Sequence, residues 1–134
     1  MADDPIWRTL RAEAVAVMGR AYAPYSHYRV GAAAAVDDGR IVTGCNVENA
    51  AHGVTLCAEC GVVSALAGSG GGRLTHFVCV GGKGDLVMPC GRCRQLLWEH
   101  GGASLLVATP RGIRTMRDVL PDAFDAEDLR EAEQ

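Results

Sequence analysis

Cys57-Ala58-Glu59 and Pro89-Cys90-Gly91-Arg92-Cys93 are the two segments that decide the fold and the chemistry of this chain. A helix that begins at Cys90 brings Cys93 onto the same face one turn later, so both sulfurs can reach one ion. Cys57 would add a third sulfur from elsewhere in the fold. Catalytic zinc sites keep three protein ligands and leave the fourth tetrahedral position open for water. The spacing therefore predicts one zinc per chain, with Glu59 placed to act on that water without binding the metal.

Two other interpretations of these cysteines stay open from spacing alone. Cys57-x-x-Cys60 and Cys90-x-x-Cys93 could form a closed, four-cysteine structural zinc site in a binding module. The 29 residues from 61 to 89 that separate the pairs are more than the roughly 15 to 20 of a zinc ribbon. Such a site would also leave Glu59 without a role. Either pair could instead be a redox dithiol.

Composition excludes several classes of partner. The formal net charge is −3, and the sequence pI of about 5.7 gives no electrostatic footprint for nucleic acid or an acidic membrane surface. No leader sequence or membrane span is expected, since the chain begins Met-Ala-Asp-Asp-Pro and has no long apolar run. We expect one domain over residues 1–134, located in the cytoplasm with reduced thiols. Cys45 and Cys79 are expected to be small buried hydrophobic residues.

The N-terminal part of the sequence predicts a helix followed by a hairpin. Asp4 can cap the helix and Pro5 suits its first position. Apolar residues then recur at helical spacing and mark one buried face: Ile6, Leu10, Ala14, Val17 and Ala21. Strands are predicted at Val30 to Val36 and Arg40 to Cys45, joined at a turn over residues 37–39. The run of alanines in the first strand predicts tight packing against a helix or another backbone.

The remaining elements alternate between helix and strand. Helices are predicted from Cys57 to Gly68 and from Cys90 to Gly101, and strands at Leu74 to Val80 and Ser104 to Ala108. This order predicts an α/β fold, a three-layer α/β/α sandwich. Thr115 is a candidate cap for a short helix from Met116 to Leu120. The charged tail, residues 125–134, is expected to fray.

The combined motifs resemble those of the small bacterial cytidine deaminases. The two zinc segments, Asn46-Val47-Glu48-Asn49-Ala50, and further matches from Ala23 to Phe124 carry this resemblance over most of the chain. It implies a mixed sheet with helices on both faces and the metal between two helix starts. It also implies hydrolytic deamination of cytidine and deoxycytidine in pyrimidine salvage, with Glu59 as general acid and base.

The resemblance assigns further site residues. Tyr28 would stack on the pyrimidine, while Asn46 and Glu48 would hydrogen-bond the ribose. Without the resemblance, Tyr28 is an ordinary surface or core aromatic residue, and Asn46 and Glu48 are ordinary turn residues. In homotetrameric relatives the residue matching Phe124 closes a neighbouring subunit's site, and His52 lies near a neighbour's nucleoside. The remaining substrate contacts that the resemblance implies are Ala50 and Ala58.

Two positions depart from the family pattern. Relatives commonly have Arg immediately after C-A-E, where this chain has Cys60, and commonly have Tyr at the position of His52. Three thiolates leave a zinc site at a formal charge of −1, so a positive partner is expected nearby. Arg94 matches another family arginine and is predicted to donate to a thiolate. Arg92 is interpreted as a solvated surface charge.

The metal segments do not by themselves fix the substrate. Deaminases of other aminopyrimidine nucleosides, such as blasticidin S deaminases, share the zinc chemistry. Asn46, Glu48 and Phe124 favour cytidine. The sequence has no phosphate-cradling glycine loop, so CMP is expected to be a poor substrate.

Overall fold

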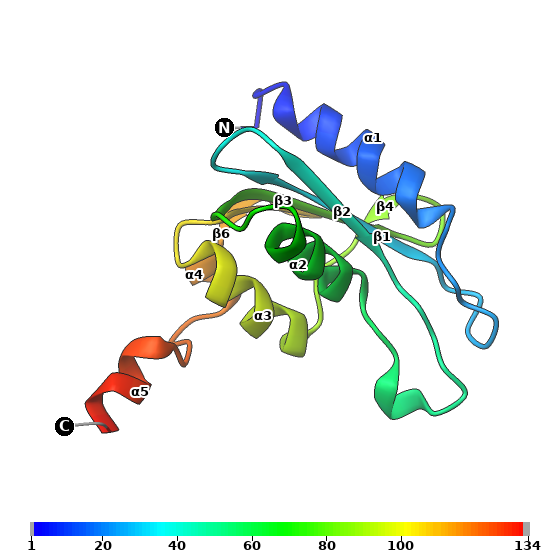
Figure 1. Cartoon of the computed structure of the whole chain (residues 1–134). Coiled ribbons are helices and arrows are strands. Elements are labelled where there is room, and N and C mark those ends of the chain that lie inside the picture. The colour runs from blue at the N-terminus through cyan, green and yellow to red at the C-terminus, as the bar shows by residue number, and fades with distance from the viewer. Residues whose placement is uncertain (1, 133–134) are drawn as a thin grey trace.

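The computed structural model describes residues 2–132 and is built on one mixed sheet with helices on both faces (Figure 1). The strand order is β2-β1-β3-β5-β6, and β4 pairs with β3. Only β3 and β5 pair in parallel; the other described pairs are antiparallel. The predicted three-layer α/β/α sandwich is confirmed. The strands are β1 (Val30–Val36), β2 (Ile41–Cys45), β3 (Leu74–Gly81), β4 (Asp85–Leu86), β5 (Leu106–Thr109) and β6 (Gly112–Thr115).

The alanine-rich strand β1 lies in the middle of the molecule and is buried on both faces. Ala32 and Ala34 pack into the core on one side of the sheet, and Ala33 and Ala35 pack into the core on the other. Side chains alternate between the two faces of a strand, so short methyl groups let helices approach closely from both sides. This packing explains why poor strand formers occupy a central strand.

Helix α1 (Ile6–Met18) covers one face of the sheet. The carboxylate of Asp4 accepts a hydrogen bond from the main-chain amide of Ile6, which supports the predicted start of the helix. Trp7, Leu10 and Ala14 are its buried residues. The apolar periodicity predicts Leu10 and Ala14 on the buried face but starts that face at Ile6, whereas the structure buries its neighbour Trp7, three residues before Leu10.

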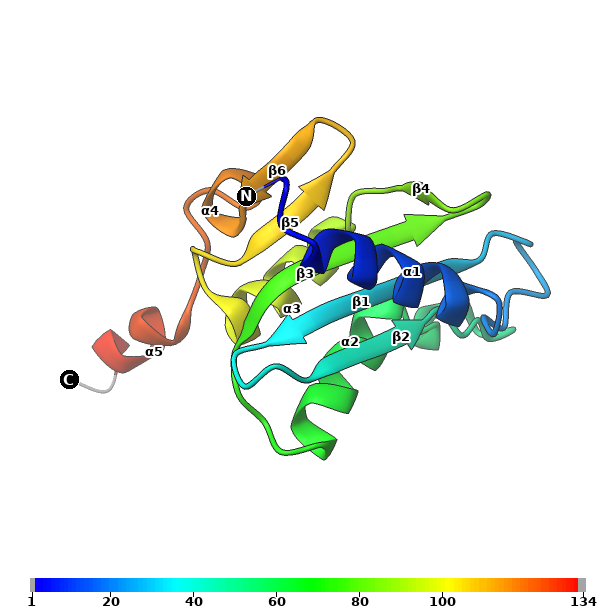
Figure 2. The ribbon, with the colours of Figure 1, turned by 90° about the horizontal axis from the view of Figure 1, so that it is seen from above.

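Helices α2 (Ala58–Gly68) and α3 (Gly91–Gly101) lie side by side on the opposite face (Figures 1 and 2). They pack on the larger core, which includes Val62, Phe77 and Leu97. Gly44 of β2 is the point of closest approach to α2, since a Cβ built there would lie 2.3 Å from the carbonyl oxygen of Ala58. A glycine is therefore required for α2 to lie directly on the strand.

The structure contains more helices and strands after residue 84 than the sequence predicts. The short strands β4 and β6 were missed, and α4 (Met116–Val119) begins after Thr115 without the predicted side-chain cap. In the charged tail, residues 126–132 form α5 (Ala126–Ala132), which extends away from the sheet (Figure 2); that this tail frays stays a prediction. Asp125 accepts a hydrogen bond from the amide of Glu127 at the start of this helix. Residues 133 and 134 lie outside the described residues.

Within residues 2–132, no helix is long and apolar enough to cross a membrane.

Gly44→Ala is expected to lower the free energy of unfolding by about 1–3 kcal/mol, because the added methyl group forces α2 away from β2. Urea denaturation of the metal-free protein measures the change. Gly68→Ala is the matched control: its Cβ would meet nothing within 4 Å, so its unfolding midpoint should be unchanged or slightly higher. Equal unfolding midpoints for Gly44→Ala and the unsubstituted protein would contradict the close packing.

Candidate active site

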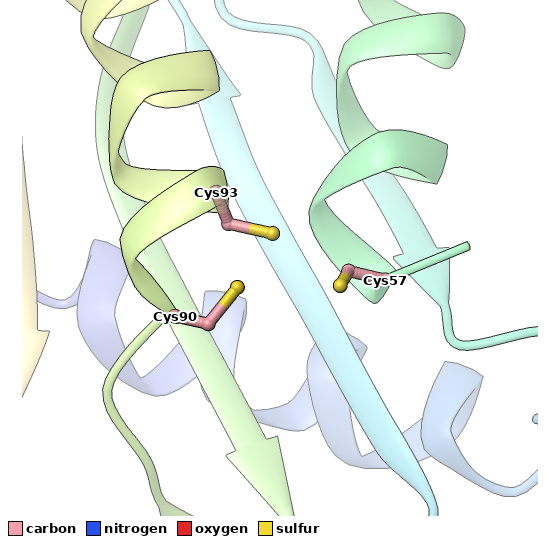
Figure 3. Close-up of side chains that lie close together, drawn as sticks. All are labelled: Cys57, Cys90 and Cys93. Atoms are coloured by element: carbon pink, nitrogen blue, oxygen red, sulfur yellow. The ribbon is translucent and has the colours of Figure 1, made fainter. Parts of the chain in front are cut away.

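The sulfurs of Cys57, Cys90 and Cys93 meet between the first turns of α2 and α3 (Figure 3). Cys57 and Cys90 are the N-cap residues of the two helices, both with extended backbone, and Cys93 lies one turn into α3. The three sulfurs all lie within 4.8 Å of one another. The structure therefore brings together the three predicted ligands from two segments far apart in the sequence.

This arrangement fits zinc. Three sulfurs bound tetrahedrally to one zinc at about 2.3 Å lie roughly 3.8 Å apart, so only a small inward adjustment is needed. Cys60 is not part of the cluster, although it lies in the first turn of α2. Among the described residues, the donor set is thus three thiols, which leaves a fourth position for water. This geometry favours a catalytic site over the closed four-cysteine alternative.

The three thiols have different environments. Hydrogen bonds from the main-chain amides of Cys93 and Arg92 help to lower the pKa of Cys90 below its usual value. Burial raises the pKa values of the Cys57 and Cys93 thiols. Cys57 and Cys90 stand at helix N-termini, where the helix dipole favours negative charge. A metal ion bound here would be needed to hold all three as thiolates.

Glu59 is buried in the first turn of α2, beside the thiol cluster. Its side chain is only 3% exposed. Burial raises the pKa of its carboxyl group, while its own main-chain amide and Cys93 donate hydrogen bonds that oppose the rise. A raised pKa favours the protonated carboxyl group, the form that can donate a proton in general acid catalysis.

A cavity of about 260 Å³ opens over the thiols and Glu59. Its lining includes seven residues that the sequence singled out for the reaction, the substrate or the metal, namely Tyr28, Asn46, Cys57, Ala58, Glu59, Cys90 and Cys93. Six further lining residues were missed: Val30, Thr55, Leu56, Cys79, Val87 and Met88. None carries a motif: four of them immediately precede the ligand segments in sequence, whereas Val30 and Cys79 are brought to the cavity by the fold. Cys79 is buried as predicted, whereas Cys45 is only half-buried.

Tyr28 and Asn46 form one side of this cavity and are tied to each other through the backbone. The Asn46 amide accepts a hydrogen bond from the amide of Val30 at 2.8 Å and donates one to the carbonyl oxygen of Tyr28 at 2.9 Å. The Tyr28 ring packs against Gly81, where a Cβ would lie 2.6 Å from the hydroxyl. Asn46 thus fixes the start of β1 and the position of Tyr28.

Glu48 faces a loop and does not line the cavity. Its carboxylate accepts hydrogen bonds from the main-chain amides of Tyr25 and Ser26 and from the Ser26 hydroxyl. The Ser26 hydroxyl is the main cause that lowers the pKa of Glu48. Within a single chain, Glu48 therefore organises the loop over residues 25–28.

Three further predicted substrate residues also lie outside the cavity lining: Ala50, His52 and Phe124. His52 begins the short helix η1 (His52–Val54) and makes an edge contact with the ring of Tyr25. The Phe124 side chain is 56% exposed, and its carbonyl oxygen accepts a hydrogen bond from Gln95.

The two arginines beside the ligands take different positions from those predicted. Arg94 does not reach a thiol in the described structure; its guanidinium donates to the carbonyl oxygens of Pro89 at 2.8 Å and Val119 at 3.1 Å. Arg94 therefore supports the turn before Cys90. Arg92 is exposed, but it is not merely solvated: its guanidinium donates to the sulfur of Cys60 at 3.4 Å. This hydrogen bond is the main cause that raises the pKa of Arg92.

Comparisons with known proteins agree with this geometry. The sequence model of the protein family described as the cytidine and deoxycytidylate deaminase zinc-binding region matches residues 7–109. Cytidine deaminase from Mycobacterium tuberculosis (strain H37Rv) is 58% identical over 126 residues, which cover 94% of this chain and 95% of that protein. The crystal structure of cytidine deaminase from M. tuberculosis superposes with a TM-score of 0.87 at 59% identity, covering 89% of this chain and 97% of that one. Cytidine deaminase from M. leprae gives a TM-score of 0.85 at 57% identity, with 87% and 98% covered.

Replacing Cys57, Cys90 or Cys93 by Ser should abolish stoichiometric zinc binding, because each change removes one of three sulfur ligands. Zinc per chain, measured by atomic emission after gel filtration, should fall from one to well below one. Cys45→Ser is the matched control and should keep its zinc, since Cys45 lies outside the cluster. Full zinc content in a Cys93→Ser protein would contradict the assigned ligand set.

Proposed function

This chain belongs to the cytidine and deoxycytidylate deaminase family, and on that premise we propose that it converts cytidine and deoxycytidine to uridine and deoxyuridine, releasing ammonia. It is a zinc-dependent hydrolytic deaminase. The observation that carries the proposal is the buried carboxylate of Glu59 beside three converging sulfurs at an open cavity. A closed structural zinc site would have no use for such a carboxylate or for the cavity.

Glu59 carries the proton transfers. Zinc held by Cys57, Cys90 and Cys93 would polarise a water molecule and make it a nucleophile at neutral pH. The Glu59 carboxylate takes a proton from that water and passes it to the ring nitrogen next to the carbon that bears the amine. As the water oxygen bonds to that carbon, Glu59 is again unprotonated; it then takes the remaining proton from the new carbon-bound hydroxyl group and delivers it to the amine, which leaves as ammonia when the carbon–nitrogen bond breaks. Burial, which raises its pKa, favours the protonated form that this second task requires.

The cavity walls position the nucleoside. Tyr28 lines the cavity, where its ring would stack on the pyrimidine, and Ala58 contributes a small surface to the same lining. The Asn46 carbonyl oxygen still has a free lone pair after accepting from Val30, so it can also accept from a sugar hydroxyl. Glu48 would reach the sugar by giving up part of its contact with Ser26. Analogues that lack the hydroxyl groups would leave these acceptors unpaired.

Some predicted substrate residues do not line the cavity of their own chain. They would have a role if each active site were completed by a neighbouring subunit. We assign Phe124, and with it His52 and Ala50, to contacts across a homotetramer interface. Exposed apolar side chains support such an interface: Tyr22, Val47 and Leu56 are each 41–55% exposed and lie on neighbouring backbone segments joined by β-bridges. Contiguous exposed apolar surface of this kind is typical of subunit contacts.

The cellular setting follows from the thiols and from the substrate. All six cysteines are free, and ligand thiols must stay reduced, which favours the cytoplasm. A free nucleoside as substrate places the enzyme in pyrimidine salvage. The acidic net charge of −3 argues against nucleotides and nucleic acids as substrates.

Loss of absorbance on deamination tests this function with cytidine, deoxycytidine, cytosine, CMP and blasticidin S. We expect turnover of the two nucleosides and little or none of the other three. Glu59→Gln should keep its zinc but lose about 10²- to 10⁴-fold in kcat, the usual contribution of a proton-transferring side chain. Substantial activity in zinc-loaded Glu59→Gln would remove Glu59 from its role, and turnover of blasticidin S alone would overturn the substrate assignment.

Mixing two impaired variants, one with a raised KM and one with little turnover, tests at low cytidine concentration whether sites are shared between subunits. Phe124→Ala should form the same oligomer by light scattering but show a raised KM. Hybrids of Phe124→Ala with Glu59→Gln subunits should recover activity, because some sites then combine Glu59 from one chain with Phe124 from another. No recovery after demonstrated subunit exchange would show that Phe124 serves only its own chain.

A further inference from the structure

The first turns of α2 and α3 are joined by a contact between a guanidinium and a thiol. Arg92 lies between the ligands Cys90 and Cys93 in sequence, and its Nη2 donates to the sulfur of Cys60 at 3.4 Å. Cys60 follows Glu59 directly, and its main-chain amide donates to the carbonyl oxygen of Cys57. The contact thus connects the two segments that carry the three metal ligands.

The charge balance of the site calls for a cation at this position. Zinc with three thiolates has a formal charge of 2 − 3 = −1, and the Glu59 carboxylate adds a further negative charge nearby. Concentrated negative charge that is partly removed from water is costly unless it is paired. Arg94 donates to two main-chain carbonyl oxygens, and none of its described hydrogen bonds goes to a sulfur.

We propose that Arg92, held in place by the sulfur of Cys60, supplies the positive charge that offsets the three-thiolate zinc site. This role rests on the proposed zinc-dependent function. Arg92 is a positioning and charge-balancing residue: it touches neither the substrate nor the metal. Its guanidinium is held at the sulfur of Cys60, which follows Glu59 directly and comes three residues after the ligand Cys57. Cys60 contributes as a hydrogen-bond acceptor and is not a ligand.

Because Arg92 lies at the outer edge of the site, its effect on zinc retention should depend on salt concentration. Arg92 is exposed, so its attraction to the thiolates passes partly through solvent and is screened by salt. Salt should therefore weaken the contribution of Arg92 to zinc retention. A residue that acted only through packing would show no such dependence.

Zinc release to an excess of a chromophoric chelator tests the proposal on the zinc-loaded protein. Arg92→Gln should release zinc about 10-fold faster than the unsubstituted protein, the lower end of the effect usual for groups that support metal ligands. Arg92→Lys, which keeps the charge, should fall between them. The difference should shrink as ionic strength rises to about 1 M, where the screening length is about 3 Å. Arg117→Gln, an equal loss of charge at an exposed position on α4, is the matched control and should release zinc at the unsubstituted rate.

Two further measurements separate charge from structure. The thermal unfolding of metal-free Arg92→Gln should match that of the unsubstituted protein, whereas a structural role would lower it. Cys60→Ala should keep one zinc per chain but release it faster, because the guanidinium loses its anchor.

Equal release rates for Arg92→Gln and Arg117→Gln would overturn the proposal. So would a zinc-free Cys60→Ser protein, which would make Cys60 a ligand. These rates are measured without substrate. A failure of the proposed deaminase function would appear separately, as zinc-loaded protein that does not turn over cytidine.

Discussion

The backbone contact between Gly44 and Gly61 is the constraint on which the site depends. A Cβ on Gly61 would lie 2.9 Å from the Cα of Gly44, so α2 rests on β2 with no side chain between them. Because α2 begins directly after Cys57, this contact sets the height of that sulfur above the sheet. It also holds Glu59, in the first turn of α2, under the cavity and away from bulk water. The alanines of β1 extend the same close packing to the neighbouring strand.

Two opposing effects meet at the helix starts. Burial disfavours charge on Cys57, Cys93 and Glu59 and raises their pKa values. Helix N-termini, main-chain amides and the bound metal favour charge on the same groups. A site balanced in this way can hold thiolates and still keep a carboxyl group that exchanges protons. The exposed cation on its outer edge would adjust that balance without entering the cavity.

The sequence predicted the parts of the molecule that local patterns determine. The strand Val30–Val36, both helix starts at cysteine, and the convergence of three thiols with Glu59 all followed from spacing, turn residues and residue chemistry. Short strands such as β6 (Gly112–Thr115) were missed because four residues carry too little periodicity and depend on pairing with β5. The positions of Arg92 and Arg94 could not be predicted, since a long side chain on a helix can reach in several directions. Of the six unpredicted cavity residues, Val30 and Cys79 are far from the ligands in sequence and reach the cavity only through the folding of the sheet, whereas Leu56 and Met88 adjoin the ligand segments but carry no recognisable motif.

Asn46 has a consequence for how this enzyme could evolve or be redesigned. Its side chain joins the amide of Val30 to the carbonyl oxygen of Tyr28. The residue that is available to bind the sugar therefore also holds two backbone segments together. Substitutions at Asn46 that change sugar preference would loosen the entry to β1 and release the aromatic ring at the same time. Substitutions that change which nucleoside is bound are therefore expected at other residues that line the cavity. Thr55 lines the cavity from the irregular link between η1 and α2, where changes cost the framework less.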